Sequence, residues 1–144
     1  MRGTGYAALD TEVRNLSAID QGQTKYAEVK VAALAGFLMA KAAAAHGRGK
    51  PKDWYDIAFV LIHNDLGGVD AAIERTNSVF PNVLKGPGKT WLTELLANFA
   101  ETNSQGVEAY ATQMFLDHPE LDRETLSADA YLAVSQFCKG IGLS

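Results

Sequence analysis

The segment from residue 41 to residue 56 contains the side chains best suited to chemistry. Its charged residues are, in order, Lys41, Arg48, Lys50, Lys52, Asp53 and Asp56. Cations beside the beginning of a helix favour phosphate, because free backbone N–H groups and the helix dipole both attract anions. A nearby carboxylate can bind Mg²⁺ or accept a proton from an attacking hydroxyl. The segment therefore predicts a site for phosphate chemistry.

The two aspartates also have a purely structural interpretation. Asp53 and Asp56 are three residues apart, so they are neighbours on one face of a helix. Asp53 would then be the N-cap of that helix and Asp56 its partner in the first turn, as in a capping box. The basic loop would be a solvated connector, and Lys41 would extend along the surface of the preceding helix. Spacing alone leaves both interpretations open.

The elements that must position these residues are mainly helical. Residues 24–31 alternate between apolar and polar types, which predicts a half-buried strand after a turn at residues 20–23. Residues 6–13 are either a strand or an irregular helical turn. We predict one domain, a mainly α-helical bundle with a short N-terminal β segment (1–31) followed by a helical part (32–144). Apolar spacing and alanine content predict helices over 32–46, 52–63, 69–79, 89–101, 106–116 and 127–140.

Composition excludes several classes of function. The chain has 144 residues, of which 47% are apolar and 21% charged, as in an ordinary globular domain. Its formal net charge of −4 disfavours non-specific binding to nucleic acid. A single cysteine, Cys138, excludes an internal disulfide and a cysteine-based zinc site. The apolar run at 31–45 is interrupted by Lys41 and is too short to span a membrane. These features predict a cytoplasmic protein.

A longer pattern surrounds the charged residues. It consists of Phe37-Leu38-Met39-Ala40-Lys41 and the run Arg48-Gly49-Lys50-Pro51-Lys52-Asp53-Trp54-Tyr55-Asp56-Ile57. This pattern resembles the C-terminal half of the AbiEii/AbiGii-type nucleotidyltransferase family, in which a lysine, an arginine and a K-x-K/R-D-x-Y-D run follow one another. The resemblance covers about residues 26–143. Residues 27–31 are similar to the family's last sheet strand, and the later segments to its C-terminal helices.

The resemblance implies nucleotidyl transfer from a nucleoside triphosphate with Mg²⁺, on the rear part of an α+β nucleotidyltransferase fold. It implies that Lys41 contacts the triphosphate. Arg48, Lys50 and Lys52 would supply positive potential or orient the loop. Asp53 would be the catalytic carboxylate, and Asp56 would support it. These residue types suit phosphoryl chemistry, which depends mostly on positioning and charge neutralisation.

The sequence departs from the family in its first half. The family carries a Gly-Ser turn and a metal-binding D-x-D pair, and neither occurs in residues 1–144. We therefore expect a fragment, one half of a split enzyme that needs a complementary N-terminal half, or a remnant reused for binding. The alternative function is a non-catalytic interaction or oligomerisation module, such as a toxin–antitoxin component. Its strand near residues 24–31 would then pair with an antitoxin or with a second copy.

Overall fold

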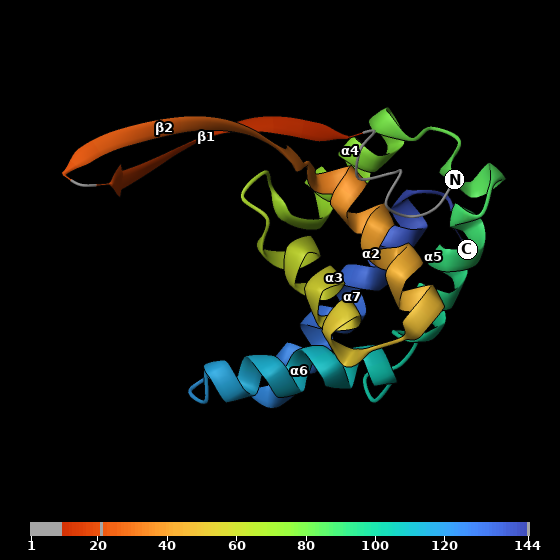
Figure 1. Ribbon diagram of the computed structural model, residues 1–144. Coiled ribbons are helices and arrows are strands. Elements are labelled where there is room, and N and C mark those ends of the chain that lie inside the picture. The colour runs from red at the N-terminus through yellow and green to blue at the C-terminus, as the bar shows by residue number, and fades with distance from the viewer. Residues whose placement is uncertain (1–9, 21, 144) are drawn as a thin grey trace.

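A β-hairpin opens the part of the chain that the computed structural model describes. That part comprises residues 10–20 and 22–143, with the backbone alone for 13–20 and 24–32. Strands β1 (Thr11–Asp20) and β2 (Gln23–Ala32) pair antiparallel in a register that sets Leu16 opposite Ala27. Gly22 takes the positive φ of 77° that the tight turn requires. Figure 1 shows the hairpin as a long ribbon that projects away from the helices.

The hairpin confirms the strand predicted at 24–31 and supplies its partner. Residues 11–20 form that partner strand, so the C-terminal end of the ambiguous segment at 6–13 is strand rather than helical turn. The rest of that segment, residues 6–9, lies outside the described residues. Within the described part, the hairpin pairs with no third strand. The β segment is therefore a ribbon rather than the edge of a larger sheet.

Helices form the remainder, as predicted. The last of them begins at Arg123 rather than near Ser127, because the Asp122 carboxylate accepts a hydrogen bond of 3.0 Å from the Thr125 N–H and caps the helix. The helix predicted at 89–101 ends earlier, at Ala97. The helical elements are α2 (Leu34–Arg48), α3 (Pro51–His63), α4 (Gly68–Val79), the short 3-10 helix η1 (Val83–Lys85), α5 (Gly88–Ala97), α6 (Gln105–Asp117) and α7 (Arg123–Gly140).

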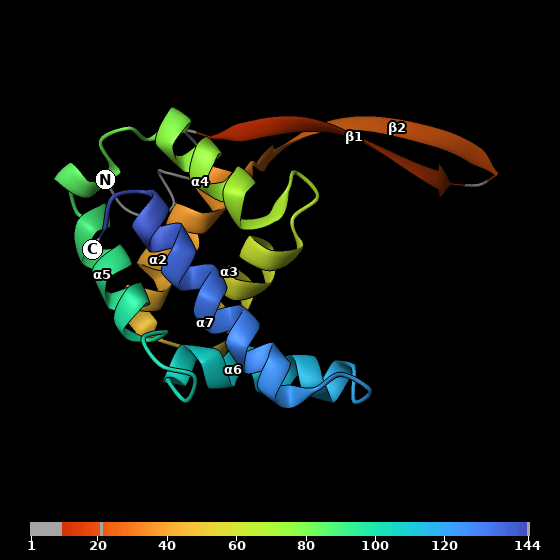
Figure 2. The same cartoon turned by 180° about the vertical axis from the view of Figure 1, so that it is seen from behind.

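One apolar core joins the helices. Helix α3 packs against α2, α6, α7 and α4, and α2 packs also against α5. Figure 2 shows α7 running diagonally across the side opposite to that of Figure 1, with α6 crossing below it. The protein is therefore mainly helical, as the sequence predicts. Its largest fully buried side chains include Met39, Ile57, Leu61, Leu92, Phe99, Tyr110 and Phe137.

The junction between α2 and α3 is short and well defined. Gly49 ends α2 in the left-handed conformation, with φ 57°, and its N–H donates to the Ala45 carbonyl at 2.7 Å. Lys50 is extended, and Pro51 begins α3 at the first helical position, where its missing N–H costs nothing. Trp54, 4% exposed, anchors α3 in the core. The end of α2 and the beginning of α3 are thereby held next to each other.

A buried carboxylate fixes the base of the hairpin to α2. Asp10 is 5% exposed, and its Oδ2 accepts a hydrogen bond of 2.9 Å from the Gly36 N–H in the first turn of α2. Its backbone carbonyl accepts from Ala33 N–H at 2.7 Å, and Arg75 Nη2 of α4 lies 3.6 Å from its Oδ1. Asp10 thus caps α2 from a distant position in the chain, because the free N–H groups of a helix start need acceptors.

Candidate functional site

The centre of the candidate site is an ion pair at the α2–α3 junction between the buried Asp53 and the half-exposed Arg48. The Asp53 side chain is 1% exposed, and both of its oxygens are bound by Arg48. Arg48 Nε donates to Oδ2 at 2.8 Å and Nη2 donates to Oδ1 at 2.7 Å. These hydrogen bonds from Arg48 hold the pKa of the Asp53 carboxyl below its ordinary value, against the opposing effect of burial. The pair therefore fixes the direction of the Arg48 guanidinium.

Lys41 joins this pair to the second aspartate. Lys41 Nζ donates to Asp56 Oδ2 at 2.9 Å and lies 3.9 Å from Asp53 Oδ1. Lys52 Nζ, one helical turn before Asp56, donates to the same Oδ2 at 3.1 Å. The Lys41 ammonium also lies 5.7 Å from the centre of the Phe37 ring, a cation–π contact. Two lysines and one arginine are thus held around two carboxylates.

The capping interpretation of the aspartates is wrong. Helix α3 has Lys50 at its N-cap position, with no side-chain cap, and Asp53 lies three residues later. The Asp53 carboxylate turns away from the helix end to bind Arg48, which lies five positions earlier. A bidentate pair with arginine offers two charge-assisted hydrogen bonds, whereas a cap offers one hydrogen bond to a backbone N–H. The predicted site residues therefore lie together because ion pairs connect them in one network.

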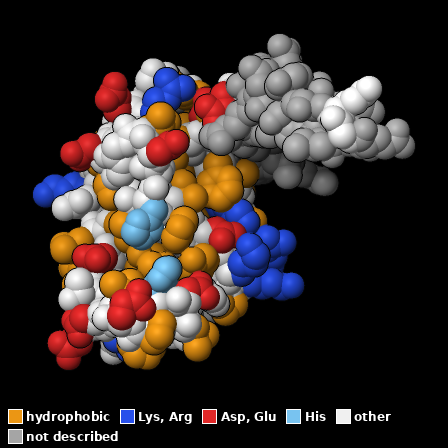
Figure 3. Space-filling view, turned by 90° about the vertical axis from the view of Figure 1, so that its left-hand side faces the viewer, with side chains coloured by type: hydrophobic (Ala, Val, Ile, Leu, Met, Phe, Trp, Pro, Cys, Tyr) orange, Lys and Arg blue, Asp and Glu red, His pale blue; other side chains and the backbone are white. Residues whose placement is uncertain are grey.

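The network retains a surplus of positive charge. Lys50, at the junction, is exposed and adds a fourth cation to Lys41, Arg48 and Lys52, against the carboxylates of two aspartates. Four cations and two anions leave a local charge of +2 in a chain whose formal net charge is −4. Figure 3 shows a group of Lys and Arg side chains at one edge of the face in view, with an acidic side chain beside it. Such a surplus attracts phosphate.

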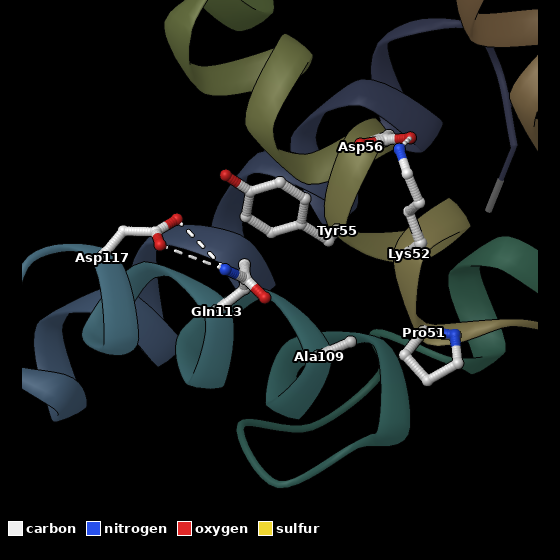
Figure 4. Close-up of a pocket in the computed structure, with 7 residues that line it drawn as sticks. All are labelled: Pro51, Lys52, Tyr55, Asp56, Ala109, Gln113 and Asp117. Atoms are coloured by element: carbon white, nitrogen blue, oxygen red, sulfur yellow. Dashed lines mark hydrogen bonds and ion pairs between the residues drawn. The ribbon is translucent and has the colours of Figure 1, made fainter.

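A groove of about 310 Å³ lies beside this network, between the beginning of α3 and the length of α6. Lys52 and Asp56 belong to both the network and the groove. Figure 4 shows Tyr55 between these two residues and the pair formed by Gln113 and Asp117. The residues that line the groove are Pro51, Lys52, Tyr55 and Asp56 of α3 and Ala109, Gln113 and Asp117 of α6.

Sequence reasoning missed the part of the site that α6 contributes. Gln113 Nε2 donates to both carboxylate oxygens of Asp117, at 3.2 and 3.1 Å. Tyr55 reaches α6 as well, because its hydroxyl lies 3.9 Å from Met114 Sδ and its ring stacks on Tyr110 with centres 6.0 Å apart. The spacing of Gln113 and Asp117, four residues apart, is a local signal that the two side chains meet. No pattern in the neighbouring sequence indicates that these two side chains would lie beside α3.

The described residues do not fit a resident Mg²⁺ ion. Magnesium takes oxygen ligands in a strict octahedral geometry. Both oxygens of Asp53 are taken by Arg48, and Oδ2 of Asp56 is taken by two lysines. Across residues 10–20 and 22–143, no three His, Cys, Asp or Glu side chains gather closely enough to hold a metal ion. The carboxylates at the junction orient cations instead.

The fold and the site together define a mainly helical protein with a cluster of lysine and arginine next to a groove. A family model for the nucleotidyl transferase AbiEii toxin of type IV toxin–antitoxin systems matches residues 2–134. The chain therefore belongs to this family. The match begins well before residue 26, so the relationship includes the hairpin as well as the helices.

The other comparisons add no relative. No curated protein and no solved structure gives a significant match. Within the described part of the chain, the helices are too short or too polar to cross a membrane.

Proposed function

We propose that the chain binds the phosphates of a nucleoside triphosphate through Lys41, Arg48, Lys50 and Lys52, and so forms one side of a nucleotidyltransferase site. The observation that carries this proposal is the ion-pair network at the α2–α3 junction. It holds three cations in fixed positions and keeps a surplus positive charge, which complements a triphosphate accompanied by Mg²⁺ as its counter-ion. Membership in the AbiEii family supports the same activity.

The two aspartates take different roles in this proposal. Asp53, 1% exposed and fully occupied by Arg48, is a positioning residue that keeps the guanidinium directed toward the phosphates. Asp56 is 17% exposed and lines the groove, so it can reach a bound molecule. In nucleotidyl transfer an acceptor hydroxyl attacks the α-phosphorus, pyrophosphate leaves, and the hydroxyl proton goes to a base. In this proposal Asp56 accepts that proton through Oδ1, since its Oδ2 already accepts hydrogen bonds from Lys41 and Lys52.

Lys41 is the most informative position for a test. Replacing it with methionine leaves each carboxylate with a cation, since Arg48 still binds Asp53 and Lys52 still binds Asp56. We therefore expect Lys41→Met to fold normally while losing a charge-assisted contact to phosphate. Binding of ATP with Mg²⁺, measured by isothermal titration calorimetry, should weaken by about tenfold to a hundredfold.

A charge-matched control separates local contact from overall charge. Lys139 is an exposed lysine in the last turn of α7, and Lys139→Met removes the same charge. ATP affinity should stay within about twofold of wild type in this variant, because Lys139 is exposed and belongs neither to the ion-pair network nor to the groove, and solvent screens exposed charges. Equal losses in both variants, or no ATP binding by the wild-type chain, would refute the phosphate site.

The projecting hairpin favours a second candidate function, interaction through its strand edges. An isolated two-stranded hairpin is marginally stable in water. In the described part of the chain β1 and β2 pair only with each other, so their outer edges present backbone groups to a partner. The partner would be a further β-structure: a second copy, an antitoxin, or a complementary catalytic half. Such pairing is compatible with nucleotide binding at the α2–α3 junction.

Proline at Val29, in the middle of β2, tests this second function. Proline lacks the N–H that strand pairing uses, so at Val29, opposite Arg14, it removes a donor from β2 and disrupts either the pairing with β1 or the outer edge that a partner would use. Light scattering after gel filtration should show a wild-type dimer that becomes a monomer in Val29→Pro, with ATP binding unchanged. A wild-type monomer would exclude self-association and leave the antitoxin or the complementary half as the partner.

A further inference from the structure

We infer that the groove between α3 and α6 binds a nucleobase that carries an exocyclic amino group. This inference rests on the proposed function, because the base would belong to the nucleotide whose phosphates the cations hold. The groove has the size for it. Its volume of about 310 Å³ lies at the lower end of the range, ~300–1,000 Å³, that small-molecule pockets occupy.

The groove is continuous with the phosphate site. Lys52 and Asp56 line one end of it, and both are bound into the network that contains Lys41. A ligand that extends from this end along the groove passes Tyr55 before it reaches α6, as Figure 4 shows. Phosphates at the cationic end therefore place the attached nucleoside between α3 and α6.

Tyr55 supplies a rigid aromatic wall. Its ring centre lies 6.0 Å from that of Tyr110 and 5.6 Å from that of Phe59, and its hydroxyl contacts Met114 Sδ at 3.9 Å. A ring held on several sides loses little conformational freedom when a ligand binds. Aromatic side chains stack on bases of any sequence because every base has a π-face. Tyr55 thus favours a planar heterocycle without selecting among the four common bases.

Selection among bases comes from the α6 end of the groove. Gln113 uses its Nε2 on both oxygens of Asp117, but Asp117 is exposed and each of its oxygens keeps a second lone pair. The groups available there, this carboxylate and the Gln113 amide oxygen, are therefore acceptors. Asp117 also lies near Tyr55. Burial is the main cause of the raised pKa of the Tyr55 hydroxyl, and the negative charge of Asp117 raises that pKa further. A carboxylate favours donors that it can approach freely. Adenine, guanine and cytosine each present an exocyclic amino group, whereas the N3–H donor of uracil lies between two carbonyl oxygens that repel a carboxylate.

The charges at the two ends also fix the direction of the ligand. At the α3 end the carboxylate of Asp56 is paired with both Lys41 and Lys52, so this end can attract phosphate, whereas the Asp117 carboxylate at the α6 end repels it because its partner, Gln113, is neutral. A nucleotide in the reverse direction would set two negative groups together. The groove is therefore polarised to accept the base, and not the phosphates, next to α6.

Binding of ATP, GTP, CTP and UTP to the full chain tests this inference, with inorganic tripolyphosphate as the probe that lacks a base. We expect the three amine-bearing nucleotides to bind about tenfold more tightly than UTP, as a hydrogen bond to a charged group predicts. Asp117→Asn should weaken these three to the level of UTP. If Asp117 acted only through its charge, the same variant would tighten all four nucleotides and tripolyphosphate alike.

Controls distinguish failure of this inference from failure of the proposed function. Glu120→Gln removes an exposed acid just beyond α6 that does not line the groove, and it should not change the preference for amine-bearing bases. If tripolyphosphate and all four nucleotides bind equally well, and only Lys41→Met weakens them, the phosphate site stands and the base pocket is refuted. If free adenosine binds and tripolyphosphate does not, the base pocket stands and the phosphate site falls. If neither binds, both are refuted.

Discussion

Replacing Asp53 by asparagine directly tests the role of the ion pair between Asp53 and Arg48. The wild-type carboxylate accepts hydrogen bonds of 2.7 and 2.8 Å from Arg48. Asparagine keeps one acceptor oxygen and turns an NH₂ donor toward the guanidinium, so one charge-assisted hydrogen bond is lost. The Arg48 side chain is 54% exposed, and water can solvate its freed N–H groups. We therefore expect the free energy of unfolding to fall by about 1.5–2 kcal/mol, the lower part of the range for a hydrogen bond to a charged group.

This cost should depend on pH in one direction. Arg48 lowers the pKa of Asp53 below the value of about 3.9 that an unfolded aspartate has. The stabilisation from this carboxylate is therefore fully present above the unfolded pKa and is lost as the pH falls through the folded pKa. Asparagine does not titrate. The difference in unfolding free energy between wild type and variant should thus be constant from about pH 5 to 8 and shrink below about pH 4.

Urea unfolding followed by far-UV circular dichroism measures this difference across the pH range. Asp65→Asn is a suitable control, because Asp65 is an exposed carboxylate in the loop between α3 and α4, and its replacement should change stability by less than ~0.5 kcal/mol. An Asp53→Asn effect as small as that of the control would show that the Arg48 pair does not stabilise the junction. An effect that stays equal at about pH 7 and pH 3 would refute the electrostatic origin assigned to it.

Further predictions concern the helices behind the site. Gly106→Ala should destabilise the protein by about 1–3 kcal/mol in thermal unfolding, because the added Cβ would overlap the buried Phe99 ring; an unchanged melting temperature would contradict this packing. Burial raises the pKa of Cys138 to about 12, so mass spectrometry should show no iodoacetamide adduct on the native protein and a full adduct in urea; modification of the native form would show that the thiol is accessible. Asp122→Ala should cost about 1 kcal/mol by removing the cap of α7, and Asp122→Asn should retain most of the stability.

Local sequence signals predicted the helices that carry the proposed phosphate site. Alanine content and apolar spacing placed α2 and α3, and Gly49 and Pro51 explain why the two helices are separated by so short a junction. The sequence predicted the start of α7 less accurately. Asp122 and Ser127 both have side chains that cap helices, and the start of α7 depends on the Asp122 contact with Thr125, which spacing did not single out. The helix therefore begins earlier than apolar spacing indicates.

The hairpin shows a different limit. The alternation in β2 marked one strand, but residues 11–20, which include Arg14 and Asn15, have no comparable apolar alternation. Their strand conformation comes from pairing with β2 rather than from their own pattern. Asp10 at the base of the hairpin carries no local signal either, since its partners, the Gly36 N–H and Arg75, come from two different helices.

The sequence by itself determined which charged residues gather near residues 41–56, because a helix, a short junction and a second helix leave few alternatives for their positions. Tertiary structure decided which partner each of these side chains contacts. Burial and the reach of Arg48 turned Asp53 from a candidate cap into the partner of a guanidinium. The groove exists only because α6 packs against α3, which brings Asp117 alongside Tyr55. Local periodicity specifies a helix and its faces, whereas the pairing of two distant faces depends on how the whole core packs.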